Sequence, residues 1–281
     1  MAGPTAPGKP AAPANLSGVK YIVAVASGKG GVGKSTTAVN MALALMAEGF
    51  RAALLDADIY GPSQPMMLGI PASTQPQVVN GNTFVPVEAH GLKSMSIGYL
   101  TTDKTPMVWR GPMAGGALEQ LLTQTLWGDL DVLVVDMPPG TGDIQLTLAQ
   151  KARVAGAVIV TTPQDIALLD ARKGMEMFRK VQIPVLGIVE NMALHTCSQC
   201  GHTEAIFGAG GGERVAQEYD TQLLGSLPLD RRIREDGDRG TPIMVASPDG
   251  DIAQSYRAIA RKLMAALSAV HATGPEITVE D

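Results

Sequence analysis

The sequence predicts an α/β fold in which a mostly parallel central sheet carries helices on both faces. Short apolar runs of strand length recur along the chain and are separated by helical stretches, so the strands are expected to be buried on both faces. A glycine-rich turn joins the first of these runs to the first helical stretch. The chain has 281 residues, 45% of them hydrophobic, which is enough for one large core.

The individual elements can be placed in order. The run YIVAVAS (21–27) is expected to be the first strand, and KSTTAVNMALALMAEG (34–49) a helix that ends at a glycine. Further strands are expected in RAALLDAD (51–58), DLDVLVVDMP (129–138), GAVIVTTP (156–163), IPVLGIVENM (183–192) and TQLLGSLPL (221–229). Helices are expected in QDIALLDARKGMEMFRKV (164–181) and in the amphipathic DIAQSYRAIARKLMAALSAV (251–270).

Three segments depart from this alternation. Residues 77–100 are poor in helix signals and are expected to form a small inserted β-hairpin. Residues 1–17 are rich in Pro, Ala and Gly and are expected to be a flexible leader without the features of a secretory signal. The folded domain is expected to span 18–270, followed by a short acidic tail at 271–281.

Composition narrows the classes of function. A net charge of −5 gives no support to a nucleic-acid-binding surface. No apolar run approaches the length of a membrane span, and the tail has no amphipathic face. Two cysteines are too few for a disulfide framework and favour a reducing compartment. We therefore expect a cytoplasmic protein with neither nucleic acid nor membrane as its partner.

The segment GKGGVGKST (28–36) matches the phosphate-loop pattern G-x-x-x-x-G-K-[ST] between a strand and a helix. Main-chain N–H groups of such a loop surround phosphate oxygens, the lysine contacts the β- and γ-phosphates, and the serine binds Mg²⁺. A glycine-rich turn without function is the alternative, but the complete pattern in this context favours a site for ATP and Mg²⁺. The expected nucleotide contacts are Gly28, Lys29, Gly30, Gly31, Val32, Gly33, Lys34, Ser35 and Thr36.

Acidic residues end two of the expected strands. Asp136 follows the run DVLVVD and is expected to hold water ligands of Mg²⁺, although an aspartate there could instead cap a helix. Asp56 and Asp58 end another strand, and one of them could orient an attacking water. The spacing alone does not decide which.

Lys29 is an additional cation directly after the first glycine of the loop. It could be a solvated loop charge. It could also stabilise negative charge during phosphoryl transfer or reach the nucleotide of a partner.

The loop KGGVGKST, with its additional lysine, resembles the deviant Walker A motif of the MinD/ParA/nitrogenase-iron-protein class of dimeric P-loop ATPases, which have the SIMIBI-type fold. Within that class, DADIYGPS, MVWRGPM, DMPPGTGD, GIVENM and a later C-x-x-C resemble the Mrp/ApbC-type iron–sulfur cluster carriers. The similarity runs from about Lys20 to the C-terminal helix. It implies an ATP-hydrolysing homodimer that receives a labile cluster from assembly scaffolds and passes it to apo iron–sulfur proteins.

The resemblance also implies roles for matching positions. Lys29 would reach the phosphates of the other protomer, and Lys34 and Asp58 would complete the catalytic set, with Asp58 positioning water in switch I. Asp136 would begin switch II, and the main-chain amide of Gly140 would contact the γ-phosphate.

The adenine would lie beside Asn191, near the turn that contains Pro228 and Asp230. One departure from the family pattern concerns the N-terminus. Many bacterial relatives carry a small domain before the ATPase, where this chain has the Pro/Ala-rich leader.

The two cysteines, Cys197 and Cys200, form a C-x-x-C within HTCSQCGH (195–202). An iron–sulfur cluster normally takes four cysteines, which a two-fold dimer would supply. A zinc site with His195 and His202 would strain so short a loop, and a redox dithiol usually opens a helix in a thioredoxin-like unit. The residues alone leave a shared metal and idle or redox thiols open. The resemblance implies a bridging cluster, expected as [4Fe–4S] with [2Fe–2S] open, and histidines that are not ligands.

Two other classes of function were considered. A MinD- or ParA-like switch acting on membrane or DNA is opposed by the acidic balance and by the lack of an amphipathic anchor. A nitrogenase-reductase-like electron donor would need cysteines near the switch segments, and those segments contain none.

Overall fold

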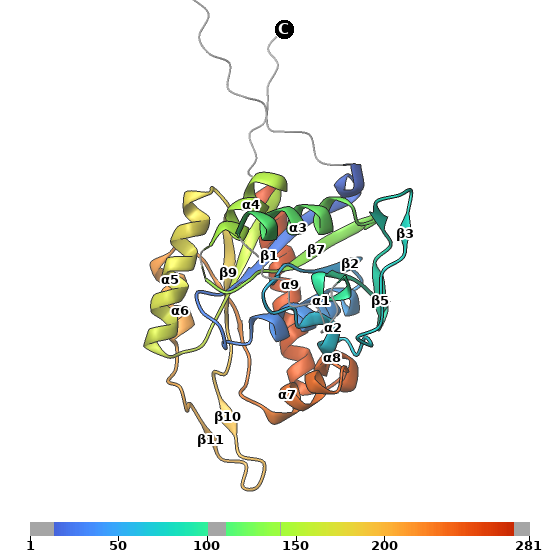
Figure 1. Cartoon of the computed structure of the whole chain (residues 1–281). Coiled ribbons are helices and arrows are strands. Elements are labelled where there is room, and N and C mark those ends of the chain that lie inside the picture. The colour runs from blue at the N-terminus through green and yellow to red at the C-terminus, as the bar shows by residue number, and fades with distance from the viewer. Residues whose placement is uncertain (1–13, 101–110, 141, 273–281) are drawn as a thin grey trace, which may run out of the picture.

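The computed structural model describes residues 14–100, 111–140 and 142–272. Its centre is an eight-stranded sheet in which β5 alone runs antiparallel to its neighbour (Figure 1). The predicted class, a mostly parallel α/β sheet covered on both faces, is confirmed. In spatial order the strands are β12 (Leu223–Ser226), β9 (Val185–Glu190), β8 (Val154–Thr161), β1 (Val19–Ala26), β7 (Leu130–Asp136), β2 (Ala52–Asp56), β6 (Leu92–Ser96) and β5 (Val87–Ala89).

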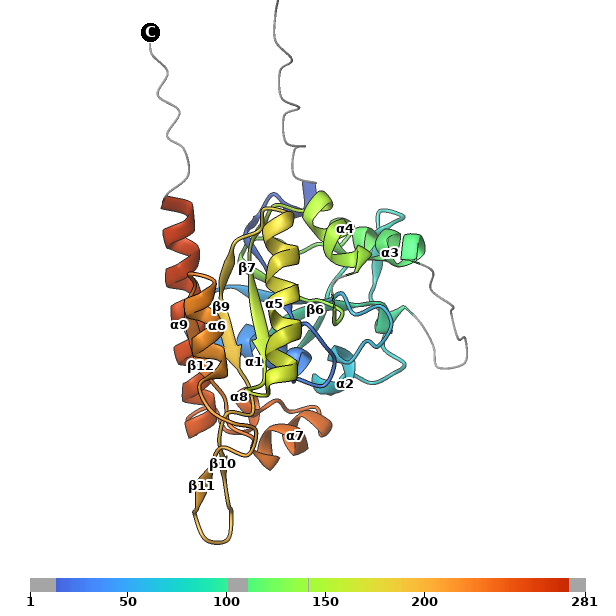
Figure 2. The same cartoon turned by 90° about the vertical axis from the view of Figure 1, so that its left-hand side faces the viewer.

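Helices cover the two faces of this sheet. The α-helices of the described residues are α1 (Lys34–Ala47), α2 (Gln64–Met67), α3 (Gly111–Thr123), α4 (Asp143–Lys151), α5 (Asp165–Lys180), α6 (Gly211–Glu218), α7 (Arg231–Asp238), α8 (Ile243–Ala246) and α9 (Asp251–Ala272). Short 3₁₀ turns, η1 (Ala14–Leu16) and η2 (Ile97–Tyr99), complete the set. One face packs on α1 and α9, and the other packs on α3 to α6 (Figures 1 and 2).

The central strand β1 explains why both faces are apolar. Tyr21, Val23 and Val25 belong to the core on the side of α1 and α9, whereas the residues between them belong to the core on the other side. Because successive side chains of a strand alternate between faces, a strand covered on both faces must be apolar throughout. The continuous run at 21–27 reflects this double burial.

The predicted insertion at 77–100 forms two pairs of strands. The first, β3 (Val78–Val79) with β4 (Thr83–Phe84), is a separate antiparallel hairpin, which confirms the prediction. The second pair, β5 with β6, extends the central sheet, because β6 pairs in parallel with β2. Buried Leu92 and Met95 on β6 join the core, so this part of the insertion belongs to the main fold.

Several expected features lie outside the described residues. These are most of the predicted leader (1–13) and tail (273–281), the segment 101–110 with most of MVWRGPM, and Thr141 of DMPPGTGD. Within the predicted leader, η1 packs onto the domain. Leu16 is buried, and Asn15 Nδ2 donates to the Thr123 carbonyl at 2.9 Å.

Among the described helices, none combines the length and the apolar character needed to span a bilayer.

The topology brings two candidate regions into position. Strands β1, β7 and β2 are parallel neighbours, so their carboxyl ends meet at one edge, where Asp56 and Asp136 are register partners. A second region, the two-stranded hairpin β10 (His195–Thr196) and β11 (Thr203–Glu204), projects from the body of the molecule (Figure 2).

Candidate functional site

The glycine-rich loop connects the end of β1 to the start of α1 at Lys34. Gly31 and Gly33 have φ values of 83° and 82°, in the left-handed region that glycine adopts without strain. A Cβ at Gly28 would lie 2.1 Å from the main chain of Asp170, and one at Gly33 would lie 2.1 Å from Asn191 Nδ2. The loop therefore needs glycine both for its turns and for close packing.

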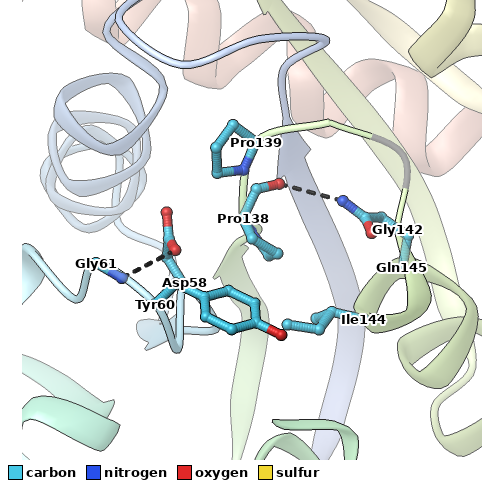
Figure 3. A pocket seen from close by; sticks show the side chains of 8 residues that line it. All are labelled: Asp58, Tyr60, Gly61, Pro138, Pro139, Gly142, Ile144 and Gln145. Atoms are coloured by element: carbon cyan, nitrogen blue, oxygen red, sulfur yellow. Dashed lines mark hydrogen bonds between the residues drawn. The ribbon is translucent and has the colours of Figure 1, made fainter. Parts of the chain in front are cut away.

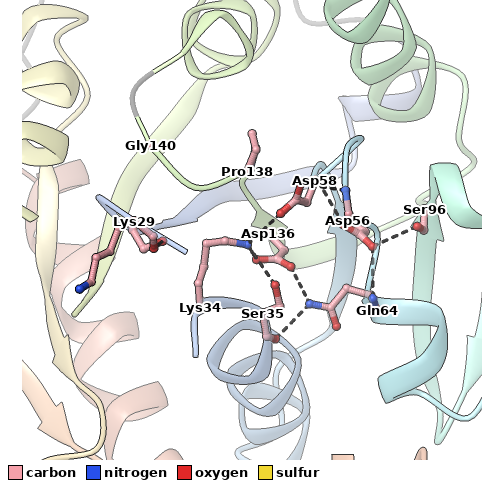
Figure 4. Close-up of polar contacts among 12 residues, drawn as sticks. Lys29, Lys34, Ser35, Asp56, Asp58, Gln64, Ser96, Asp136, Pro138 and Gly140 are labelled. Atoms are coloured by element: carbon pink, nitrogen blue, oxygen red, sulfur yellow. Dashed lines mark hydrogen bonds and ion pairs between the residues drawn. The ribbon is translucent and has the colours of Figure 1, made fainter. Parts of the chain in front are cut away.

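The predicted charged residues meet at the carboxyl edge of the sheet (Figure 4). Lys34 Nζ lies 2.5 Å from Asp136 Oδ1, 3.0 Å from Ser35 Oγ and 3.9 Å from Asp58 Oδ2. The side chain of Asp136 is fully buried and that of Lys34 is 6% exposed. A buried charge is costly without a partner of opposite sign, so Asp136 keeps the Lys34 ammonium group in place beside the loop.

Asp56 and Asp58 have different surroundings. Asp56 is fully buried and accepts hydrogen bonds from Ser96 Oγ at 3.0 Å and from the Gln64 and Asp58 amides at 3.2 and 3.1 Å. Burial, with the negative charge of Asp136, raises the pKa of Asp56 to about 7. Asp56 is thus a structural acid that shapes the loop after β2.

Asp58 instead lines an open cavity of about 560 Å³ with Tyr60, Pro138, Ile144 and Gln145 (Figure 3). Burial raises the pKa of Asp58, and the charge of Lys34 opposes that shift. Of the two acids that the spacing left undecided, Asp58 is the one whose side chain reaches a space that water can enter.

Gln64 at the start of α2 is a site residue that the sequence reasoning missed. Its Nε2 donates to Asp136 Oδ2 at 2.8 Å and to the Ser35 carbonyl at 3.0 Å. The side chain is 1% exposed, and its Oε1 has no hydrogen-bond partner within the described structure. A polar residue directly after DADIYGPS, at the start of a helix, was the available signal.

The switch II segment after β7 is held by Gln145, a second residue that the sequence reasoning missed. Gln145 Nε2 donates to the Pro138 and Gly140 carbonyls at 3.1 and 3.0 Å. The Gly140 amide donates to the Ser27 carbonyl at 3.0 Å. Contact between this amide and a phosphate would require that hydrogen bond to break.

Lys29 is half-buried, and its side chain points away from Lys34 and Asp136 (Figure 4). Its carbonyl accepts a hydrogen bond from Ser27 Oγ at 2.9 Å, which fixes the main chain of the loop. The lysine therefore belongs to the loop but not to the buried charge cluster.

The predicted adenine contacts surround a second cavity of about 220 Å³ next to the loop. Asn191, Pro228 and Asp230 line it with Gly33 and Thr36 of the loop. Asn191 also closes the loop from the side, since its Nδ2 donates to the Val32 carbonyl at 2.9 Å. Residues more than 150 positions apart in sequence thus form one pocket.

Cys197 and Cys200 lie in the turn of the β10–β11 hairpin. The Cys197 amide donates to the His202 carbonyl and the Gly201 amide to the Cys197 carbonyl, both at 2.9 Å. Main-chain hydrogen bonds from Cys200, which has the larger effect, and from Gln199 lower the pKa of the Cys197 thiol. The Cys197 thiol therefore loses its proton more readily than an isolated cysteine does, and the thiolate is the form that binds metal.

Both cysteines are free, Cys197 half-buried and Cys200 exposed. The part of the chain that the structure describes contains no cluster of three or more His, Cys, Asp or Glu side chains able to hold a metal ion. His195 turns its Nδ1 toward the Leu229 carbonyl at 3.0 Å.

A mostly parallel sheet, a G-x-x-x-x-G-K-[ST] loop and buried acids at two adjacent strand ends together define a P-loop NTPase. Residues 18–264 match the family described as the NUBPL iron-transfer P-loop NTPases of the ParA group. The chain belongs to this family.

Relatives with high identity carry related names. An iron–sulfur cluster carrier protein of Pseudomonas fragi is 66% identical over 245 residues, covering 87% of this chain and 85% of that one. The Escherichia coli K12 protein of the same name is 60% identical over 252 residues, covering 90% and 68%. The mouse iron–sulfur cluster transfer protein NUBPL is 51% identical over 251 residues, covering 89% and 78%.

Solved structures share the fold. A nucleotide-binding protein of Archaeoglobus fulgidus in complex with ADP is 34% identical, with a TM-score of 0.74, and the match covers 86% of this chain and 94% of that one. The cell division ATPase MinD of Pyrococcus furiosus has a TM-score of 0.66 at 20% identity, covering 88% and 99%, and shows a common fold alone.

Proposed function

We propose that this chain is an ATP-hydrolysing carrier that holds a labile iron–sulfur cluster between two protomers and transfers it to apo iron–sulfur proteins. The observation that carries the proposal is the projecting C-x-x-C turn, whose two free cysteines are half of the four that a cluster normally takes. The names of the relatives point to the same cargo.

The number of ligands supports a homodimer. A cluster normally takes four cysteine ligands, and each chain has two. Because a two-fold axis places identical surfaces against each other, two projecting hairpins can bring four thiolates together. Cys200 is exposed, so its sulfur is available to such a partner. We propose a [4Fe–4S] cargo shared in this way.

The nucleotide site fits ATP with Mg²⁺. Ser35 Oγ and the carboxylate of Asp136, which both contact Lys34 Nζ, are hard oxygen donors of the kind that Mg²⁺ and its water ligands require. When bound, Mg²⁺ supplies charge neutralisation of the β- and γ-phosphates. Lys34 binds the same phosphates, and Asp58 orients the attacking water from the open cavity.

Lys29 supports the same dimer. Its side chain is directed away from the Lys34–Asp136 pair of its own chain. A cation in this position can stabilise charge on a nucleotide held by the facing protomer. We propose that Lys29 acts across the interface and that hydrolysis, by reordering the segments around Asp58 and Gly140, moves the protomers and loosens the shared cluster.

The proposed partners follow from this role. They are cluster assembly scaffolds as donors and apo iron–sulfur proteins as acceptors. A labile cluster and free cysteines require a reducing compartment, so we propose a cytoplasmic location. We also propose that the ATPase domain spans 18–270, consistent with the family match over 18–264.

Anaerobic reconstitution with iron and sulfide tests the proposal. The expected product is a dimer that binds one cluster per two chains, read from iron and sulfide content, absorption and mass. Cys197→Ser or Cys200→Ser should remove the cluster and leave ATP binding unchanged, because symmetry repeats the change in both chains.

Ser198→Ala in the same turn is the matched control and should retain the cluster. One metal centre per monomer, or one zinc ion per chain without an iron chromophore, would contradict the shared site. Transfer is then measured as the activity that an apo iron–sulfur enzyme recovers with and without ATP.

A further inference from the structure

The β10–β11 hairpin that carries the cysteines is called the cysteine hairpin below, and the cavity lined by the predicted adenine contacts is called the base pocket. The two lie on adjoining stretches of chain. After β9, Ala193 donates its amide to the Leu227 carbonyl at 2.9 Å. One step further, the Leu229 amide donates to the Leu194 carbonyl at 2.8 Å. A short main-chain ladder therefore joins the segment that leads into the hairpin to the turn before α7.

His195 makes the last contact of this ladder with its side chain. Its Nδ1 lies 3.0 Å from the Leu229 carbonyl oxygen. A carbonyl oxygen only accepts hydrogen bonds, so Nδ1 carries the hydrogen. His195 is also the first residue of β10, paired with Glu204, and it stands two residues before Cys197.

The other end of the ladder forms the wall of the base pocket. Leu229 and Asp230 line this cavity together with Asn191 and Met192. Met192 has a φ of 57°, in the left-handed region that costs a non-glycine side chain energy. Such a conformation persists only where its surroundings hold it. Met192 itself lines the base pocket, and the next residue, Ala193, belongs to the main-chain ladder.

We propose that His195 is a positioning residue that couples occupancy of the base pocket to the cysteine hairpin through its hydrogen bond to Leu229. The role of this coupling rests on the proposed function, because the coupling would link nucleotide binding to cluster binding. Coupling between two sites is reciprocal, so a nucleotide that shifts Leu229 alters the setting of Cys197, and a ligand on the cysteines alters nucleotide affinity equally.

The test uses metal-free, reduced protein and no cluster. Cys197 and Cys200 are the only cysteines of the chain, so a thiol-alkylating reagent reports on the hairpin alone. In the wild type, saturating Mg-ADP should change the alkylation rate by about fivefold, the lower range of typical coupling between sites. In His195→Ala, the rates with and without Mg-ADP should be equal within error.

Variants of matched shape separate coupling from packing. His195→Asn places an amide nitrogen near the position of Nδ1 and should restore the response to Mg-ADP. His195→Gln places its nitrogen near the position of Nε2 and should not. His202→Ala, which changes the exposed histidine on the other side of the cysteines, should respond as the wild type does.

Each remaining outcome has a definite meaning. The coupling is overturned if Mg-ADP leaves the wild-type rate unchanged or if His195→Ala keeps the full response. It is also overturned if the response varies over a tenfold range of protein concentration, which would assign it to association of chains. Calorimetric loss of ADP binding in His195→Ala would make His195 part of the pocket wall instead. Failure to retain iron would refute the proposed cargo and leave the alkylation result intact.

Discussion

The phosphate end of the sheet and the cysteine hairpin are built in opposite ways. Around Lys34, groups from β2, β7, α1 and α2 converge in a buried network within one chain. Around Cys197, a two-stranded hairpin outside the core offers two sulfurs and little packing. The difference supports the proposal that each chain binds nucleotide by itself, whereas a cluster is shared between two chains.

The same difference supports the proposed lability of the cluster. Parts of a protein with few buried apolar contacts open at low free-energy cost, while core strands open only with global unfolding. A carrier needs a firmly held nucleotide and an easily released cargo. The proposed function accordingly has the nucleotide at the edge of the sheet and the cluster on the projecting β10–β11 hairpin.

The largest effect is expected for Lys34→Ala. The β- and γ-phosphates lose their main cationic contact, so ATPase activity should fall by about 100-fold or more. Steady-state hydrolysis and ATP binding measure this. Lys173→Ala, an exposed lysine on α5, is the control, and unchanged turnover in Lys34→Ala would remove the nucleotide-site assignment.

Asp58→Ala is expected to reduce hydrolysis by roughly 10-fold to 100-fold while ATP affinity stays close to that of the wild type. Orientation of water matters in the transition state and not in the bound ground state. Turnover and equilibrium binding are measured on the same preparation. Weaker binding with normal turnover would make Asp58 a structural residue like Asp56.

A mixing experiment tests directly whether one chain or two chains bind each cluster. Wild-type chains are mixed equally with Cys197→Ser chains, allowed to exchange and then reconstituted. Random pairing leaves about one quarter of dimers with four cysteines, so bound cluster should fall about fourfold while ATP binding stays constant. A fall to only one half would mean that each chain binds its own metal.

The last prediction concerns the stability of the chain without ligand. The pKa of Asp56 is raised to about 7, above the value of about 3.9 in an unfolded chain. Between these values the folded state binds more protons, so the free energy of unfolding falls as pH rises, by on the order of 1 kcal/mol per pH unit. Asp56→Asn should lose this slope in urea unfolding from pH 4 to 7, and parallel profiles would contradict it.

Local pattern was enough to predict much of this protein. The double burial of β1 leaves a continuous apolar run, the phosphate loop needs Gly28 to Thr36 in an unbroken order, and Cys197 and Cys200 are the only cysteines. Each of these features is contained in fewer than about ten consecutive residues, so strand, loop and thiol pair were predictable in type and place.

Tertiary structure decided what depends on distant residues. Asp56 and Asp58 are equivalent in spacing, and only the packing of Ser96 and Gln64 buries one while the other faces a cavity. Gln64 itself became a site residue because parallel strand order brings Asp136 beside it. The pairing of β6 with β2 and the contact of His195 with Leu229 have the same origin. Burial and hydrogen-bond partners depend on which strands become neighbours, and no short stretch of sequence contains that information.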